Sequence, residues 1–292
     1  MSSGIRRRPR TGAALAGAAV LLLAALGLAV PATSGAFTAR ITNTADSAGA
    51  SSRFTCATTF SASSNAGNAY FEYALTGQAA TAPDSSTAGN TGSFQPNGSH
   101  PTGQATASTA CPNDPGSFYA PDGSTNWLQT AQSVRVSPVN ITLAIWFSTT
   151  AAGGYLVGLN SAQTCDGAVY DRQIYLDTSG RVVFGVYNSA ANTVASTASY
   201  NDGKWHQAVA TFSGTSGIAL WVDGQKVGSD PAQTTTQSNT GYWCVAQGKL
   251  GGWPNAPTST AFRGGLRFAA VYRTVLSDSE IAAEYRNGRP TA

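Results

Sequence analysis

Charged residues are scarce in this chain. They make up 11% of its 292 residues, and the formal net charge is +3. Without four arginines ahead of an N-terminal apolar run, thirteen basic residues face fourteen acidic ones; the four are Arg6, Arg7, Arg8 and Arg10. A near-neutral chain offers no electrostatic surface for a polyanion, which argues against a nucleic-acid partner.

Glutamate occurs at only three positions, Glu72, Glu280 and Glu284. Glycoside hydrolysis needs two carboxyl groups that flank the scissile bond. Glu280 and Glu284 fit one short helix, and Glu72 stands alone. The aspartates fall mostly at turns, where their side chains cap the backbone; these are Asp177, Asp202 and Asp223. The sequence therefore predicts no catalytic pair.

Histidine is limited to His100 and His206, and neither a Gly-x-Ser-x-Gly elbow nor a phosphate-cradling loop occurs. His206 follows Trp205 in a strand-like segment, where a packing or hydrogen-bonding role is commoner than general-base catalysis. We predict no catalytic residues and no enzyme activity.

Cysteine occurs four times, without any Cys-x-x-Cys spacing. An even, well-spaced set fits two disulfides in an oxidising compartment. Four cysteines allow three pairings, of which we favour Cys56–Cys111 and Cys165–Cys244. The spacings do not fit zinc ligation, and we predict no metal site.

A long apolar run occurs near the N-terminus, from about Gly12 to Val30, behind the basic residues. Small residues follow at Ser34-Gly35-Ala36, the pattern of a secretory signal. We predict cleavage after Ala36 and a secreted or cell-surface location. The alternative is an uncleaved anchor, the one route by which we expect membrane contact.

The remaining chain reads as many short strands, with 42% hydrophobic residues to fill a core. Alternation predicts inward faces for three segments: Ile141, Leu143, Ile145 and Phe147; Ile218, Leu220 and Val222; and Leu266, Phe268, Ala270 and Tyr272. Hairpin signals are Asp223-Gly224 and the turn 177–180. We predict an all-β antiparallel sandwich of two sheets.

One C-terminal helix interrupts the β pattern. Ser277 and Glu280 form a capping box, and Leu276 and Ile281 form the matching hydrophobic staple. Gly288 stands where a C′ glycine ends a helix.

Four stretches resemble the laminin-G-like (concanavalin-type) jelly roll, and they occur in the right order. They are the loop Asp84–Gly92, the hairpin YNDGKWHQAVATF…ALWVDG at 200–224, the strand FRGGLRFAAVYR and the helix motif LSDSEIAAEYRNG. The resemblance covers Tyr70 to Arg289. We expect a signal segment at 1–36, a strand segment and linker at 37–69, and the jelly roll at 70–290. Ala36-Phe37-Thr38-Ala39 and Asn43 also resemble exported proteins processed by a SipW-like peptidase.

The resemblance raises two further possibilities, a hydrolase active site and a calcium site. In the hydrolases of this superfamily one strand carries closely spaced Glu, Asp and Glu, and no such strand occurs here. A family calcium site uses an aspartate on the last long strand, where this chain has Leu266-Arg267-Phe268. Because Ca²⁺ requires oxygen ligands, we disfavour calcium, although Asp84 could contribute one ligand, and we expect no cofactor.

Recognition of a ligand is the remaining role. Sugars stack on exposed aromatic rings beside amides, which makes five residues candidates: Trp127, Tyr242, Trp243, Trp253 and Asn255. Trp243 could instead cover the disulfide of Cys244, and Trp146, Trp205 and Trp221 are expected in packing. We predict a non-catalytic module that binds a glycan or an extracellular or envelope protein. One alternative is a cell-envelope or matrix component that assembles by strand addition, and a remote alternative is a glycoside hydrolase.

Overall fold

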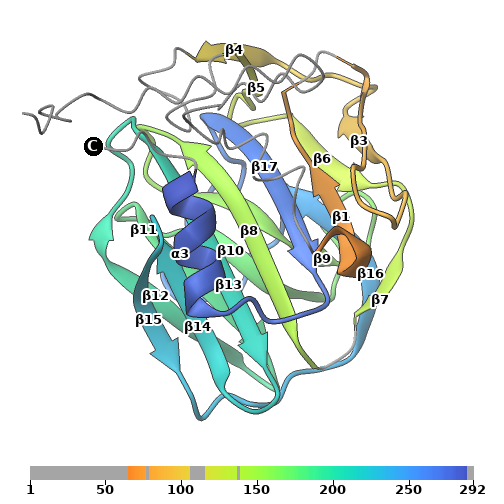
Figure 1. Ribbon diagram of the computed structural model, residues 1–292. Coiled ribbons are helices and arrows are strands. Elements are labelled where there is room, and N and C mark those ends of the chain that lie inside the picture. Colours follow the sequence, from red (N-terminus) through yellow and green to blue (C-terminus); the bar gives the residue numbers. More distant parts are fainter. Residues whose placement is uncertain (1–64, 77–78, 106–115, 137–138, 288–292) are drawn as a thin grey trace, which may run out of the picture. The chain divides into compact units, whose positions relative to one another are not determined.

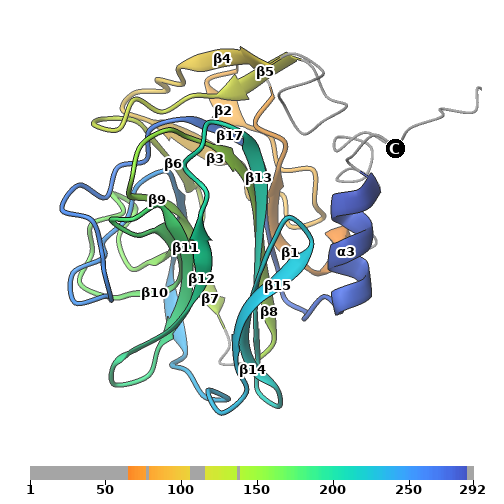
Figure 2. The same ribbon diagram turned by 90° about the vertical axis from the view of Figure 1, so that its left-hand side faces the viewer.

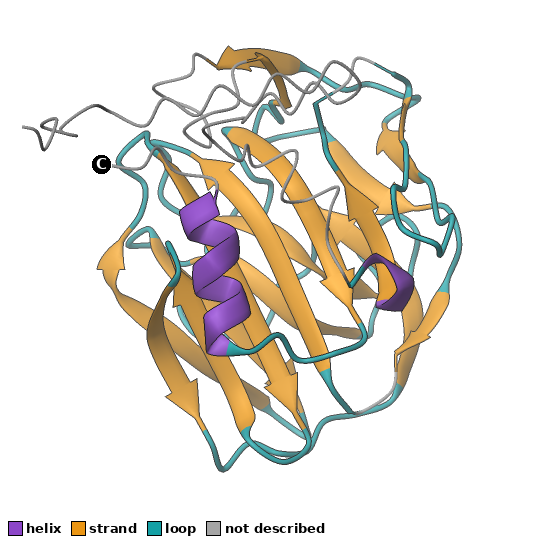
Figure 3. Ribbon diagram, viewed as in Figure 1, coloured by secondary structure: helices purple, strands orange, loops and turns teal. Residues whose placement is uncertain are grey.

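The computed structural model describes residues 65–76, 79–105, 116–136 and 139–287 (Figure 1). They belong to a compact unit, Ser51–Ala292. Outside the described residues lie the predicted signal segment 1–36 with Ala36, residues 37–64 with Cys56, and Cys111 and Gly288. Strands dominate the described part (Figure 3), as the predicted all-β class requires.

The strands form two antiparallel sheets that face each other (Figure 2). The eight-stranded sheet has the order β15 (Gln225–Asp230), β14 (Gly217–Val222), β13 (Trp205–Ser213), β8 (Ile141–Ser148), β17 (Gly265–Tyr272), β5 (Gly116–Tyr119) and β4 (Thr102–Ala105), with β1 (Ala69–Tyr73) also paired to β17. A 3-10 turn, η1 (Ala66–Asn68), precedes β1.

The nine-stranded sheet has the order β12 (Ala191–Ser199), β11 (Arg181–Tyr187), β10 (Tyr170–Leu176), β9 (Gly154–Asn160), β16 (Asn239–Val245), β6 (Trp127–Thr130), β3 (Gly92–Gln95) and β2 (Thr81–Ala82), with β7 (Val134–Val136) paired to β16. Consecutive strands pair as hairpins at several places, including β10–β11 and β14–β15.

The core lies between the sheets, and β8 and β14 supply it as their alternation predicts. Ile141, Leu143, Ile145 and Phe147 of β8, and Ile218, Leu220 and Val222 of β14, are all buried in it. The predicted turn Asp223-Gly224 joins β14 to β15 with φ angles of 54° and 73°. Two positive φ angles are those of a type I′ turn, which matches the twist of the strands.

The inward face predicted for β17 is wrong beyond Leu266. The register against β8 shifts between Arg267 and Ala270, and Phe268 has a φ of 49°. A bulge adds one residue and so reverses the alternation after it. As a result Ala269 and Val271 reach the core, whereas Phe268, Ala270 and Tyr272 face the opposite side of the sheet.

Helix α3 (Asp278–Asn287) lies against the outer face of the eight-stranded sheet (Figure 2). The capping box is confirmed, because the Ser277 amide donates to Glu280 Oε2 at 2.7 Å and the Glu280 amide donates to Ser277 Oγ at 3.3 Å. Leu276 and Ile281 are buried together against this sheet, as the staple predicts. No described helix is long and apolar enough to cross a membrane.

Candidate binding site

Residues 246–264, between β16 and β17, cross the outer face of the nine-stranded sheet (Figure 2). The amide of Phe262 donates to the carbonyl of Ala246 at 2.7 Å and closes this loop at its base. Leu250 and Trp253 of the loop are buried against outward-facing side chains of the sheet, including Tyr175. The disulfide Cys165–Cys244, one of the two favoured bridges, is confirmed and belongs to the same cluster.

Strand β10 fixes the loop through polar side chains. The hydroxyls of Tyr170 and Tyr175 donate to the carbonyls of Gly251 and Pro254, each at 2.6 Å. The Gln173 amide, oriented to match its neighbours, accepts from Trp253 Nε1 at 3.2 Å. These contacts hold the loop to the sheet at three points, Gly251, Trp253 and Pro254, so its surface is preorganised.

The turn Leu250–Trp253 separates two surface hollows. The amide of Trp253 donates to the carbonyl of Leu250 at 3.0 Å, and Gly252 has a φ of 81°. A positive φ at the third residue is the requirement of a type II turn, which favours glycine there. Gly251, Gly252 and Trp253 line both hollows.

The first hollow, here named the tyrosine hollow, has a volume of about 380 Å³. Tyr170, Tyr187 and Trp253 supply its aromatic rings, and Gln237 and Asn239 supply amides. Tyr187 is 36% exposed, whereas Trp253 is only 5% exposed. None of the described lining residues carries a charged side chain. Such a surface suits a neutral ligand with both apolar and hydroxyl groups.

A buried ion pair lies beside the tyrosine hollow. Asp171 and Arg172 are neighbours in β10, and both side chains are essentially inaccessible. Side chains of consecutive strand residues ordinarily point to opposite faces. Here the register shifts after Asp171, and Arg172 has a φ of 49°, which allows the two side chains to meet.

The ion pair holds two segments of the hollow's rim, the end of β11 and the stretch 237–239. Asp171 Oδ1 accepts from the amide of Tyr187 at 2.7 Å, and Oδ2 accepts from Asn239 Nδ2 at 3.0 Å. Arg172 donates to the carbonyl of Gln237 at 2.7 Å. Burial raises the pKa of the Asp171 carboxyl, and the Arg172 charge and these donors oppose that rise.

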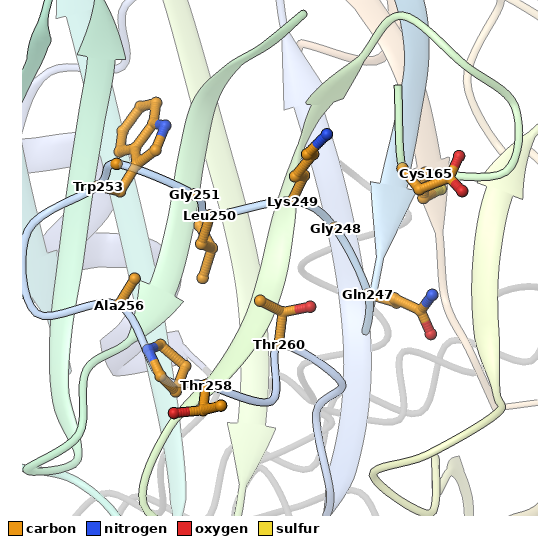
Figure 4. A pocket seen from close by; sticks show the side chains of 13 residues that line it. Cys165, Gln247, Gly248, Lys249, Leu250, Gly251, Trp253, Ala256, Thr258 and Thr260 are labelled. Carbon is orange, nitrogen blue, oxygen red and sulfur yellow. The ribbon is translucent and has the colours of Figure 1, made fainter. Parts of the chain in front are cut away.

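The second hollow, here named the threonine hollow, is shown in Figure 4. Its volume is about 670 Å³. Thr258, Thr260 and Gln247 bring hydroxyl and amide groups to it, and Lys249 and Asp166 bring one charge of each sign. The Lys249 ammonium lies 5.8 Å from the centre of the Tyr170 ring. The charges of its lining balance, so this hollow also favours no ionic ligand.

Of the five predicted ligand residues, Trp253 alone lines either hollow. Trp243 is 1% exposed, and its ring lies 5.7 Å from that of Tyr70 inside the core. The expectation of an exposed ring there is wrong, because Trp243 points inward while Cys244 points outward. It therefore does not cover the disulfide either.

The other three predicted residues line neither hollow. Trp127 and Tyr242 are half-buried on neighbouring strands, and Trp127 Nε1 donates to Gln129 at 2.7 Å. Asn255 is exposed with a φ of 50°, in a turn where the Ala256 amide donates to the Trp253 carbonyl at 3.4 Å. Asparagine tolerates this conformation, which accounts for the residue without a ligand.

Sequence reasoning did not single out Tyr170, Tyr187, Gln237 and Asn239. One signal was present, the predicted hairpin at 177–180. In the structure this hairpin pairs Gln173 with Gly185, and the same register continued by two residues places Asp171 opposite Tyr187. Nothing local connects Gln237 and Asn239 to that hairpin, since they follow about fifty residues later.

Asp84, considered for calcium, instead organises its loop. Its carboxylate accepts the amides of Glu72 and Ser86 at 2.9 Å and of Asn90 at 2.7 Å. Arg267, at the position compared with a calcium ligand, is buried. Within the described ranges, no three His, Cys, Asp or Glu side chains converge as metal ligands.

Solved structures share this fold at low sequence identity. One is the binding domain of botulinum neurotoxin DC in complex with rat synaptotagmin II, with 12% identity, a TM-score of 0.52, and coverage of 77% of this chain and 52% of that one. Another is domain 4 of AbnA, an extracellular arabinanase from Geobacillus stearothermophilus, in complex with arabinotriose, with 12% identity, a TM-score of 0.50, and coverage of 75% and 98%. This chain thus spans about half the length of the toxin binding domain.

Comparison with curated protein sequences finds no match. The family model of the concanavalin A-like lectin/glucanases superfamily matches residues 122–282, more than half of the chain. That range contains both hollows and confirms the laminin-G-like resemblance. The chain belongs to the concanavalin A-like lectin/glucanases superfamily.

Proposed function

We propose that this protein is a non-catalytic, extracellular carbohydrate-binding module that holds a neutral glycan in the tyrosine hollow. The observation that carries the proposal is the rim itself: the exposed ring of Tyr187, the half-buried ring of Tyr170 and amide side chains are fixed beside a cavity without charged lining. The C–H faces of sugars stack on aromatic rings, and their hydroxyls pair with amides.

The rings are held in place before a ligand arrives. The Tyr170 hydroxyl donates to Gly251, and the Tyr187 hydroxyl donates to the carbonyl of Ser189 at 3.3 Å. Asn239 is fixed through its amide nitrogen by Asp171. Preorganised groups lose little conformational entropy on binding, which favours affinity for a weakly interacting ligand.

The positions of the carboxylates support a role without catalysis. Glu72 is buried in β1, where it accepts a hydrogen bond from the Tyr272 hydroxyl at 2.9 Å. Glu280 and Glu284 belong to helix α3. Asp166 is the one carboxylate among the described residues that line the hollows. A glycosidase needs two carboxyl groups across the bond that it cleaves.

The comparisons support a binding role at the level of fold. The toxin domain is described with a protein ligand and the arabinanase domain with arabinotriose. A disulfide at Cys165–Cys244 suits an oxidising, extracellular compartment. We extend the proposal to export through residues 1–36 with cleavage after Ala36, and to a jelly roll beginning near Tyr70.

A glycan array probed with the disulfide-intact chain tests the proposal. We expect retention on neutral glycans, reduced roughly 30-fold by Tyr187→Ala because central aromatic anchors contribute most of the affinity. Val139→Ala, at another exposed apolar residue (53%), is the matched control and should bind normally.

Two further variants separate this site from the residues expected from sequence alone. If Trp127→Ala or Tyr242→Ala abolishes retention while Tyr187→Ala does not, the ligand binds elsewhere on the sheet and the assignment is wrong. Retention of no glycan, or release of reducing sugar from a bound polysaccharide, also contradicts the proposal.

A further inference from the structure

The two hollows meet at one low ridge of backbone. Gly251 and Gly252 form the ridge, and both line the tyrosine hollow and the threonine hollow. We infer, building on the proposed function, that a single linear neutral glycan crosses this ridge and occupies both hollows, so that the protein binds internal units of a polymer. The two hollows are then subsites of one groove.

The ridge is open toward solvent. A Cβ built on Gly252 would have no atom within 4 Å, so packing does not require glycine there. A Cβ on Gly251 would approach the Tyr170 hydroxyl at 3.3 Å, the group that holds the ridge to β10. With no side chain above the backbone, a chain can pass from one hollow to the other.

The ridge is also firmly placed. The carbonyl of Gly251 is held by Tyr170, and Trp253, which follows the ridge, packs edge-on against Tyr175 with ring centres 6.3 Å apart. A fixed, bare ridge can define the register of a ligand. A loop secured only at its ends could not do so.

The chemistry of the threonine hollow matches that of its neighbour. Thr258, Thr260 and Gln247 offer donors and acceptors of the kind that pair with sugar hydroxyls (Figure 4). Lys249 and Asp166 carry charges of opposite sign, so the lining of the threonine hollow has no net charge, and the lining of the tyrosine hollow has no charged side chain. A polymer of neutral sugars fits both, whereas a polyanion would meet no net positive field.

Binding to neutral oligosaccharides of increasing length tests this inference. Arabino-, xylo- and cello-oligosaccharides of up to about eight units are titrated against the full chain by calorimetry, because occupation of a second linked subsite raises affinity. We expect at least one series to bind about tenfold more tightly as the hexaose than as the disaccharide.

A side chain on the ridge should obstruct long ligands selectively. Gly252→Asn keeps a residue that tolerates positive φ, and it should weaken the hexaose about tenfold while leaving the disaccharide unchanged. Gly89→Asn is the matched control, since Gly89 also has a positive φ (62°) and nothing near its Cβ position. This control should bind every length as the unmodified chain does.

A second variant keeps the test decisive if Gly252→Asn fails to fold. Gln247→Ala, in the threonine hollow, should also weaken only the longer ligands, and Gln104→Ala on β4 should change nothing. An affinity that stops rising at the disaccharide, is lost with Tyr187→Ala and is insensitive to both ridge and Gln247 variants overturns the inference but leaves the proposed function standing. If no oligosaccharide or array glycan binds, the proposed function itself fails.

Discussion

The backbone amide of Tyr187 donates a 2.7 Å hydrogen bond to Oδ1 of Asp171, a carboxylate sealed from solvent. Tyr187 ends β11 at the rim of the tyrosine hollow, and Asp171 stands opposite it near the start of β10. The same carboxylate pairs with Arg172, which in turn holds the carbonyl of Gln237. A buried charge pair thus determines where an exposed aromatic ring lies.

Replacing Asp171 should be strongly destabilising. Asp171→Asn leaves the buried Arg172 guanidinium without its carboxylate, and removing one partner of a buried pair costs about 3–5 kcal/mol. Urea denaturation gives the free energy of unfolding. The double variant Asp171→Asn/Arg172→Met should lose less than Asp171→Asn alone, because no uncompensated charge remains. A loss under about 1 kcal/mol in the single variant would contradict this account.

Removing the Tyr170 hydroxyl should loosen the ridge. Tyr170→Phe keeps the ring but deletes the 2.6 Å bond to the Gly251 carbonyl, at a cost of about 1 kcal/mol. Hydrogen exchange at the Trp253 amide, which donates within this turn, should accelerate. Tyr187→Phe, whose longer hydroxyl bond of 3.3 Å lies at an exposed site, serves as control and should leave that exchange rate unchanged.

Loss of the disulfide should lower stability substantially. Cys165 and Cys244 are separated by 79 residues, and closing a loop of that length is worth roughly 4 kcal/mol. Cys165→Ser/Cys244→Ser should therefore show a correspondingly lower denaturation midpoint. Adding reductant to this double variant should lower it again if Cys56 and Cys111 are paired as predicted, and an unchanged midpoint would argue against that second bridge.

His206 should make stability depend on pH. Burial lowers the pKa of its ring, but hydrogen bonds to Asp223 (2.8 Å) and Asp202 (3.0 Å) outweigh burial and raise the pKa above its ordinary 6.5. A raised pKa in the folded state adds stability that is complete below the unfolded value and lost as pH rises through the folded value. We expect the free energy of unfolding to fall above about pH 6.5.

The two histidines provide a matched pair for that measurement. His206→Gln should abolish this part of the pH dependence, and His100→Gln should retain it. A curve for His206→Gln that parallels the unmodified chain between about pH 6 and pH 9 would show that another group is responsible.

Glu284 should oppose folding at alkaline pH. Burial, followed by repulsion from Glu280 and Glu72, raises its pKa to about 7 from 4.5. For an acid this shift means that stability is complete below the unfolded pKa and is lost as pH rises through 7. Since Glu284 is only half-buried, Glu284→Gln should stabilise the protein by about 1 kcal/mol near pH 8. Near pH 4 the two proteins should have equal stability, and urea denaturation at both values decides the matter.

Short-range patterns in the sequence were sufficient for much of the scaffold. Alternation in β8 and β14, the Asp223-Gly224 turn and the Ser277–Glu280 capping box each depend on residues a few positions apart. Such features are selected by backbone sterics and local hydrogen bonds, so they can be read without the fold. The candidate site could not be read in that way, and Trp253 was the one residue of its lining that aromatic composition identified.

The amino-acid sequence by itself determined the sandwich, its hairpins and its C-terminal helix. Tertiary structure decided which rings are exposed: Trp243 and Cys244 are adjacent, yet one enters the core and the other faces the loop 246–264. It also decided the bulges at Asp171 and Phe268, where the register against the neighbouring strand shifts. Exposure and register of this kind depend on partners far along the chain, and for that reason the tyrosine hollow emerged only from the folded protein.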